Sequence, residues 1–110
     1  MSYIIHITAT AERDIMRAAD HIEFNLKNPT AADHLLDVAT DQINSLANMS
    51  KKFRLVDEPV LAGWGIRFIT VNNFLAFYTI DEEKQMVIVV RFLYQKSNWN
   101  AILRQGFSLV

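Results

Sequence analysis

The sequence predicts an α+β fold in which a two-helix hairpin packs on one face of a four-stranded, mainly antiparallel sheet. Three features point to it: a short apolar run near the start, two amphipathic helical patterns after it, and three strand-like runs in the last third. The expected element order is β-α-α-β-β-β-α, with a short final helix. Helices that cover one face of a small antiparallel sheet are an established layer architecture.

The three strand-like runs span residues 68–71, 74–80 and 86–92 and are rich in β-branched and aromatic side chains. Only the short polar breaks at residues 72–73 and 81–84 or so separate them. A parallel crossover needs a dozen or more residues, so breaks this short require antiparallel neighbours. The last third of the chain is therefore expected to be a three-stranded meander.

The first strand is expected at residues 3–7, and a helix follows it. Thr8 or Thr10 is expected to cap that helix, because a hydroxyl oxygen accepts hydrogen bonds from the free amides of a first turn. The first strand must also pair with the later meander, since an isolated strand leaves its backbone groups unsatisfied. Apolar residues at helical spacing predict one buried stripe on this helix. The stripe comprises Ile15, Ala18 or Ala19, Ile22 and Leu26.

The second helix is expected to begin at Asn28-Pro29 and to run to about Met49. Asn28 can cap it, and proline at the first helical position loses no hydrogen bond because that amide has no helical partner. Its predicted buried side consists of Ala32, Leu35, Ala39, Ile43 and Leu46. A row of carboxylates, Asp33, Asp37 and Asp41, is expected to face solvent, since no ligand partner is aimed at it.

The rest of the chain is expected to be a loop at residues 50–65, a short helix at about 97–104 and an apolar tail at 107–110. The tail is expected either to cover the sheet edge or to join an interface. The 110 residues, 51% of them hydrophobic, predict a single domain over 1–110 with a packed core.

Composition excludes several classes of site. The chain has no cysteine, which excludes disulfides and thiolate metal sites. His21 and His34 have no spaced second ligand, and the common nucleotide, metalloprotease and acyl-transfer motifs are absent from the sequence. No metal and no cofactor are therefore expected. The sequence shows no signal peptide and no membrane span, so we expect a cytoplasmic protein without a membrane partner.

Charge is unevenly distributed along the chain. Residues 1–50 carry three basic and seven acidic side chains, whereas residues 51–110 carry eight basic and five acidic ones. An anionic partner would therefore meet the C-terminal half. On charge alone, ordinary surface charge is the better interpretation, because the excess is far below that of a dedicated nucleic-acid binder.

Several segments together resemble the RelE/ParE superfamily, the toxins of bacterial type II toxin–antitoxin systems, which include plasmid stabilisation proteins. The resemblance covers nearly the whole chain and rests on agreement in order, not on one decisive motif. The segments that carry it are Thr8–Ile15, Asn28–Ala32, Ile43–Leu46, Gly65–Arg67, Phe74–Asp81 and Val87–Tyr94.

The resemblance implies a growth-inhibiting toxin neutralised by a cognate antitoxin. ParE-like members bind and inhibit DNA gyrase, whereas RelE-like members are endonucleases that cut messenger RNA on the ribosome. The long hairpin, the mild net charge and Leu75, which stands where RelE carries an arginine, favour the ParE-like branch. The ribosome-dependent endonuclease is the alternative, and an inactive antitoxin-binding relative is a third.

The same resemblance indicates candidate functional residues. If the chain is a ribonuclease, Arg67, Tyr94 and Lys96 would be catalytic: Tyr94 as acid or base, Lys96 or Arg67 on the phosphate. Structural roles remain open for Arg67 as a solvent-facing strand residue and for Tyr94 as a core aromatic.

The candidate target-binding residues are Arg91, Asn98 and Trp99. Arg91 has a structural alternative, pairing with a carboxylate across the sheet. Trp99 has one as well, as an aromatic anchor for the last helix, and that role is favoured.

Overall fold

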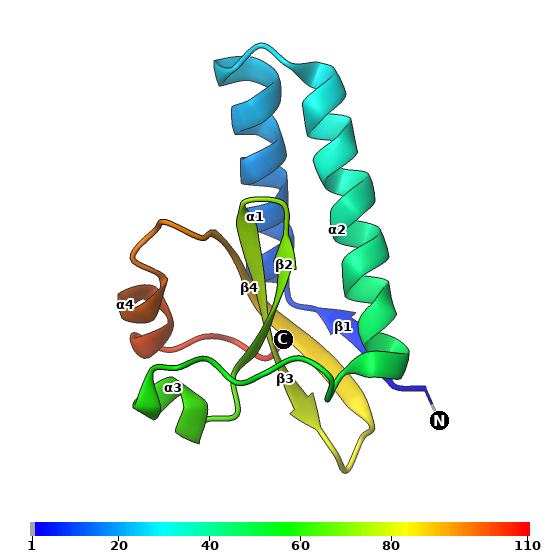
Figure 1. Ribbon diagram of the computed structural model, residues 1–110, viewed down its shortest axis with the longest axis vertical. Coiled ribbons are helices and arrows are strands. Elements are labelled where there is room, and N and C mark those ends of the chain that lie inside the picture. Colours follow the sequence, from blue (N-terminus) through cyan, green and yellow to red (C-terminus); the bar gives the residue numbers. More distant parts are fainter. Residues whose placement is uncertain (1) are drawn as a thin grey trace.

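The computed structural model describes residues 2–110 and has the predicted α+β architecture (Figure 1). A four-stranded sheet carries the long helical hairpin on one face and two short helices on the other. Its elements are β1 (Ile4–Ile7), α1 (Ala9–Asp20), the π-helical turn η1 (His21–Asn25), α2 (Pro29–Met49), α3 (Pro59–Gly63), β2 (Arg67–Val71), β3 (Phe74–Asp81), β4 (Met86–Tyr94) and α4 (Trp99–Arg104).

The sheet confirms the expected meander. Its strand order is β1-β4-β3-β2, and β2, β3 and β4 are antiparallel neighbours. The first strand pairs with β4, as the need to satisfy its backbone predicts, and this pairing is parallel, with Ile4 opposite Met86 and Ile7 opposite Val89. Parallel pairing is possible here because the whole helical hairpin and two strands separate β1 from β4 along the chain.

Both hairpin helices are capped by the predicted type of residue. The Thr8 hydroxyl accepts from the amide of Ala11 at 3.1 Å, and the Asn28 side chain accepts from the amide of Ala31 at 3.1 Å. Thr8, not Thr10, is therefore the cap of α1. The α2 stripe is buried as expected: Ala32, Leu35, Ala39, Ile43 and Leu46 are each at most 2% exposed. Leu35, Ala39, Ile43 and Leu46 share one core cluster with strand residues Ile69, Val71, Tyr78, Val87 and Val89.

The predicted stripe of the first helix is wrong at its last position. Ile15 and Ile22 pack against the hairpin core, but Leu26 is 62% exposed. The helix widens into a π turn, in which the amide of Leu26 bonds to the carbonyl of His21. In addition, the hairpin tip extends beyond the β2–β3 turn (Figure 1), so no sheet lies there to cover Leu26. Phe24 in the same turn is also 65% exposed.

The second face of the sheet is covered by elements that the sequence only partly predicts. The segment 50–65, expected to be a loop, contains α3, whose first turn is capped by the Glu58 carboxylate accepting from Leu61. Leu61 and Leu103, from α3 and α4, are fully buried against Phe77 and Val90 of the sheet. The tail contributes half-buried Phe107 to this layer, whereas Leu109 and Val110 are exposed.

A β-bulge in β4 changes which side chains face the hairpin. Phe77 lies opposite Arg91 while Tyr78 lies opposite Val89, so Val90 is the extra residue. The bulge shifts the in–out alternation by one position. As a result, Phe92 joins Val89 in the hairpin core, and Arg91 is free to reach the edge of the sheet.

Candidate functional site

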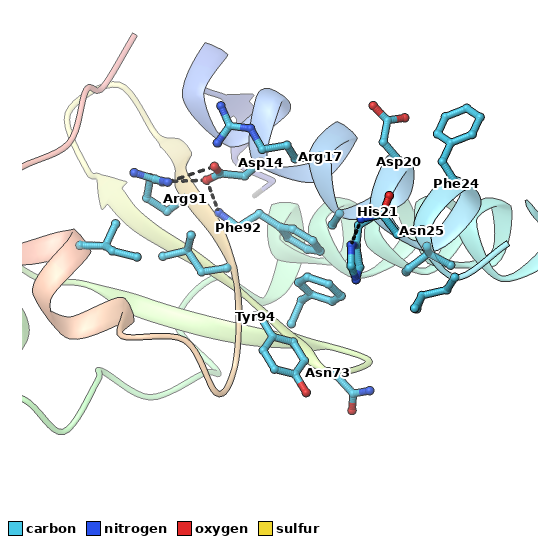
Figure 2. Close-up of a pocket in the computed structure, with 16 residues that line it drawn as sticks. Asp14, Arg17, Asp20, His21, Phe24, Asn25, Asn73, Arg91, Phe92 and Tyr94 are labelled. Atoms are coloured by element: carbon cyan, nitrogen blue, oxygen red, sulfur yellow. Dashed lines mark hydrogen bonds and ion pairs between the residues drawn. The ribbon is translucent and has the colours of Figure 1, made fainter. Parts of the chain in front are cut away.

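An open groove of about 1120 Å³ lies between the first helix of the hairpin and the end of β4. Figure 2 shows its walls: α1 and η1 on one side, β4 and the β2–β3 turn on the other. Ile102 of α4 closes one end. The groove thus lies where the helical hairpin extends beyond the end of the sheet.

The groove has an aromatic and aliphatic floor with a mixed rim. Phe74 stacks on Phe92 with ring centres 5.1 Å apart, and Tyr94 meets Phe74 edge-on at 5.7 Å. Exposed Phe24 and Leu26 line the groove near the hairpin tip, and the Phe24 ring points away from the aromatic floor (Figure 2). The charged rim comprises Arg17 and Asp20, with His21 beside them. A contiguous exposed apolar surface rimmed by polar groups is typical of a protein-binding site.

An ion pair fixes the end of the groove nearest β1. The Asp14 carboxylate accepts from Arg91 Nε at 2.7 Å, from Arg91 Nη2 at 3.0 Å and from the amide of Phe92 at 3.0 Å (Figure 2). β1 pairs with β4 only as far as Val89. Beyond that point this edge of β4 has no strand neighbour among residues 2–110, and Asp14 accepts the hydrogen bond of the Phe92 amide. The Asp14 side chain is 4% exposed and that of Arg91 is 20% exposed.

The candidate target-binding residue Arg91 is thus paired with a carboxylate, and that carboxylate comes from α1 and not from a strand across the sheet. The other two candidates of that set lie next to each other at the start of α4. Trp99 packs on Phe77 with ring centres 5.1 Å apart, while Asn98 is exposed. Within the described chain, the Asn98 side chain forms no capping hydrogen bond to α4.

Tyr94 and Lys96 lie together at the end of β4 and are both exposed. The turn that carries them is held by the amide of Gln95, which bonds to the Asn73 carbonyl at 2.9 Å, and by Ser97, whose hydroxyl donates to the Tyr94 carbonyl at 2.6 Å. Tyr94 belongs to the groove wall, whereas Lys96 is not among the groove-lining residues.

Arg67 lies far from these two residues. It begins β2 opposite Tyr78, whereas Tyr94 lies opposite Phe74 on the other side of β3. Four residues of strand and two inter-strand spacings separate them, or roughly 16 Å between α-carbons. The guanidinium of Arg67 donates to the Phe53 carbonyl at 2.6 Å. The structure thus brings Tyr94 and Lys96 close to each other and places Arg67 at the opposite end of the sheet.

Other sequence expectations concern charge and membranes. The row Asp33, Asp37 and Asp41 is exposed as predicted, and within residues 2–110 no cluster of three potential metal ligands occurs. Leu75, which was expected to stand where RelE carries an arginine, is only 9% exposed on the second face of the sheet. Over the same described residues, no helix is both long and apolar enough to cross a membrane.

Sequence reasoning missed Asp14 and Phe24. Asp14 lies three residues after Ala11 and four residues before Ala18. These spacings place it on the same helix face as both alanines, which is the buried face. A carboxylate on an otherwise apolar stripe was the available signal, because a buried charge requires a partner. For Phe24 the signal was the polar residues Asn25, Lys27 and Asn28 that follow it, which mark the end of the covered helix.

One buried titratable group lies outside the groove. Tyr78 is fully buried on β3, and its hydroxyl donates to the Ser50 carbonyl at 2.6 Å. Burial raises the pKa of Tyr78 to about 12, and the nearby positive charge of Arg67 partly opposes that rise. The hydroxyl is therefore neutral throughout the physiological range.

We expect Tyr78 to make stability fall with pH in the alkaline range. Its pKa is about 12 in the folded protein and near 10 in the unfolded chain. Between these values the unfolded state loses the proton first, so ionisation favours unfolding and the contribution of Tyr78 decreases as pH rises from 10 towards 12. Urea unfolding across this range measures it. Tyr78→Phe should flatten the pH dependence, and an unchanged slope would contradict the assignment.

Comparison with known families identifies the chain. The sequence model of the family described as "ParE toxin of type II toxin-antitoxin system, parDE" matches residues 5–99, which include the hairpin, β2, β3, β4 and β1 except for Ile4. The chain belongs to the ParE toxin family. This result agrees with the resemblance carried by the short segments of the sequence, and it places the groove and the Asp14–Arg91 pair within a toxin domain. A search of curated proteins found no match.

Two solved structures share this ParE fold at low sequence identity. The chromosomal ParDE toxin–antitoxin system from P. aeruginosa gives a TM-score of 0.69 at 18% identity, covering 84% of this chain and 96% of that chain. The toxin–antitoxin complex RelBE2 from Mycobacterium tuberculosis gives 0.58 at 17% identity, covering 86% and 99%. At these identities the likeness establishes the fold alone.

Proposed function

We propose that this ParE-family toxin inhibits growth in the cytoplasm by binding DNA gyrase, and that a cognate antitoxin neutralises it. Family membership supports the toxin role. The choice of gyrase rests on how the candidate catalytic residues are distributed over the sheet. A binding inhibitor needs only a complementary surface, whereas an endonuclease needs several groups around one phosphate.

The separation of Arg67 from Tyr94 and Lys96 carries this proposal. Roughly 16 Å separates the α-carbons of Arg67 and Tyr94, and the guanidinium of Arg67 is directed to the Phe53 carbonyl at 2.6 Å, so the two side chains do not converge on one site in this arrangement. Two other arginines line the groove: Arg91, whose guanidinium is held by Asp14 at 2.7 Å, and Arg17 on the rim formed by α1. RNA cleavage on the ribosome, with Tyr94 and Lys96 as its remaining candidates, is the alternative.

We further propose that the antitoxin occupies the groove between α1, η1 and β4. The two similar solved structures are both toxin–antitoxin complexes. An apolar groove of about 1120 Å³ beside a helix suits an amphipathic helix of a partner, which would bury its apolar side against Phe74, Phe92 and Leu26. Arg17 and Asp20 on the rim offer one charge of each sign to such a helix.

The two mechanisms differ in their response to three substitutions. We expect cells that express Arg67→Ala, Tyr94→Phe or Lys96→Ala to stop growing as they do with the unchanged chain, and to show no new cleavage of translated messenger RNA. Lys84→Ala, on an exposed turn, is the matched control. Loss of messenger cleavage in these variants, with thermal unfolding unchanged, would establish the ribonuclease instead. A chain that arrests no growth at all would be the inactive antitoxin-binding relative.

A further inference from the structure

A second, smaller pocket lies at the end of the sheet opposite the groove. It has a volume of about 330 Å³ and is formed by the end of α2, the α3–β2 loop and the end of β3. We call it the Arg67 pocket. Its principal lining residues are Lys51, Trp64, Gly65, Arg67, Thr79 and Glu82. The volume is at the lower end of the range for small-molecule sites.

Arg67 gives this pocket an uncompensated positive charge. The side chain is half-buried, and its only acceptor within residues 2–110 is the Phe53 carbonyl, at 2.6 Å from Nη1. No carboxylate of the described chain lies within ion-pair distance of it. Glu82, the one acidic residue of the lining, is paired with Lys51 at 3.0 Å. A guanidinium has five N–H donors, so several remain for an external anion.

Trp64 gives the same pocket an exposed aromatic surface. Its side chain is 48% exposed although it is the largest apolar group nearby. An edge-on contact with Phe107, with ring centres 6.1 Å apart, supports the indole from the protein side. Gly65 follows with φ of +78°, a conformation that favours glycine and turns the chain from Trp64 into β2. The ring is thus held at the pocket while much of its surface remains open.

We propose that the Arg67 pocket binds a small anion that carries an aromatic ring, with the anionic group on Arg67 and the ring against Trp64. Guanidinium groups bind phosphate and carboxylate through paired N–H donors. Indole stacks on flat heterocycles without requiring one particular base. A nucleoside monophosphate combines both features and is of suitable size. This site is independent of the groove, so it stands or fails separately from the toxin mechanism.

Titration of the full chain with adenosine monophosphate, followed by amide chemical shifts, tests the site. We expect shifts concentrated in residues 63–67 and 79–82. Adenosine and inorganic phosphate each supply one half of the ligand and should bind about tenfold more weakly. Shifts centred on the groove, or none at millimolar ligand, would overturn the proposal, and phosphate binding as tightly as the nucleotide would overturn the role of the ring.

Two variants assign the contacts. Arg67→Gln should weaken nucleotide binding about tenfold or more, because it removes the charge from the anion site. Trp64→Ala should weaken nucleotide binding by about tenfold. Because the ring is half-exposed, this variant should stay folded, and it tests the site if Arg67→Gln unfolds. Arg13→Gln makes the same chemical change on the exposed surface of α1 and should bind within about twofold of the unchanged chain. Unaltered binding by Trp64→Ala and by folded Arg67→Gln would refute the assignment.

Discussion

Arg91→Ala is expected to destabilise the protein by about 3–5 kcal/mol, the range seen when one member of a buried ion pair is removed. The substitution leaves the Asp14 carboxylate, only 4% exposed, with the Phe92 amide as its one remaining donor. The loss of stability caused by Asp14→Ala should lie at or below the lower end of that range. Its partner Arg91 is 20% exposed and can recover some hydration, although the Phe92 amide then loses its acceptor. Chemical denaturation measures both changes.

The two substitutions should also be strongly non-additive. Once either partner is gone, removing the other eliminates an unpaired charge, so the double variant should cost clearly less than the sum of the singles. Asp37→Ala removes an exposed carboxylate from α2 and should change stability by about 0.5 kcal/mol or less. Costs below about 1 kcal/mol for both Asp14→Ala and Arg91→Ala would contradict a structural role for the pair.

The second large effect concerns the antitoxin. Phe24→Glu and Leu26→Glu should each weaken binding of the cognate antitoxin by about 100-fold or more. An apolar anchor would be lost and a charge would be placed against an apolar partner surface, together costing about 2.7 kcal/mol. Both side chains are more than 60% exposed, so folding should be unaffected. Calorimetric titration with the cognate antitoxin, which we expect to be encoded beside this gene and to co-purify with the chain, measures the loss.

Met16→Glu is the matched control for these groove variants. Met16 lies on the same helix and is 52% exposed, but it is not among the groove-lining residues. It should bind antitoxin within about threefold of the unchanged chain, since surface substitutions away from an interface have small effects. If Phe24→Glu and Leu26→Glu also bind normally, the antitoxin uses another surface.

Local signals in the sequence were sufficient for most of the fold. Short polar breaks fixed the antiparallel meander, and Thr8 and Asn28 marked the starts of the hairpin helices. The period of the hydrophobic pattern identified the side of α2 that packs on the sheet. These features depend on neighbours in the chain, so they can be recognised without knowledge of the tertiary structure.

Features that depend on distant contacts could not be predicted in this way. Leu26 has the right spacing for burial, but the sheet does not extend to the hairpin tip. The bulge at Val90 decides that Phe92 enters the hairpin core, and it leaves Arg91 to pair with Asp14. Likewise, the sequence places Arg67 at the start of the first meander strand and Tyr94 just after the last one, and only the register shows that they lie at opposite ends of the sheet.

Inhibition of purified DNA gyrase is the most direct test of the proposed function. The chain should block supercoiling of relaxed plasmid at concentrations comparable to that of the enzyme. If the antitoxin is added to the chain first, gyrase should keep its supercoiling activity. In a parallel reaction, translating ribosomes given the same protein should yield full-length messenger. Undisturbed supercoiling together with ribosome-dependent messenger cleavage would contradict the proposal and assign the chain to the ribonuclease branch.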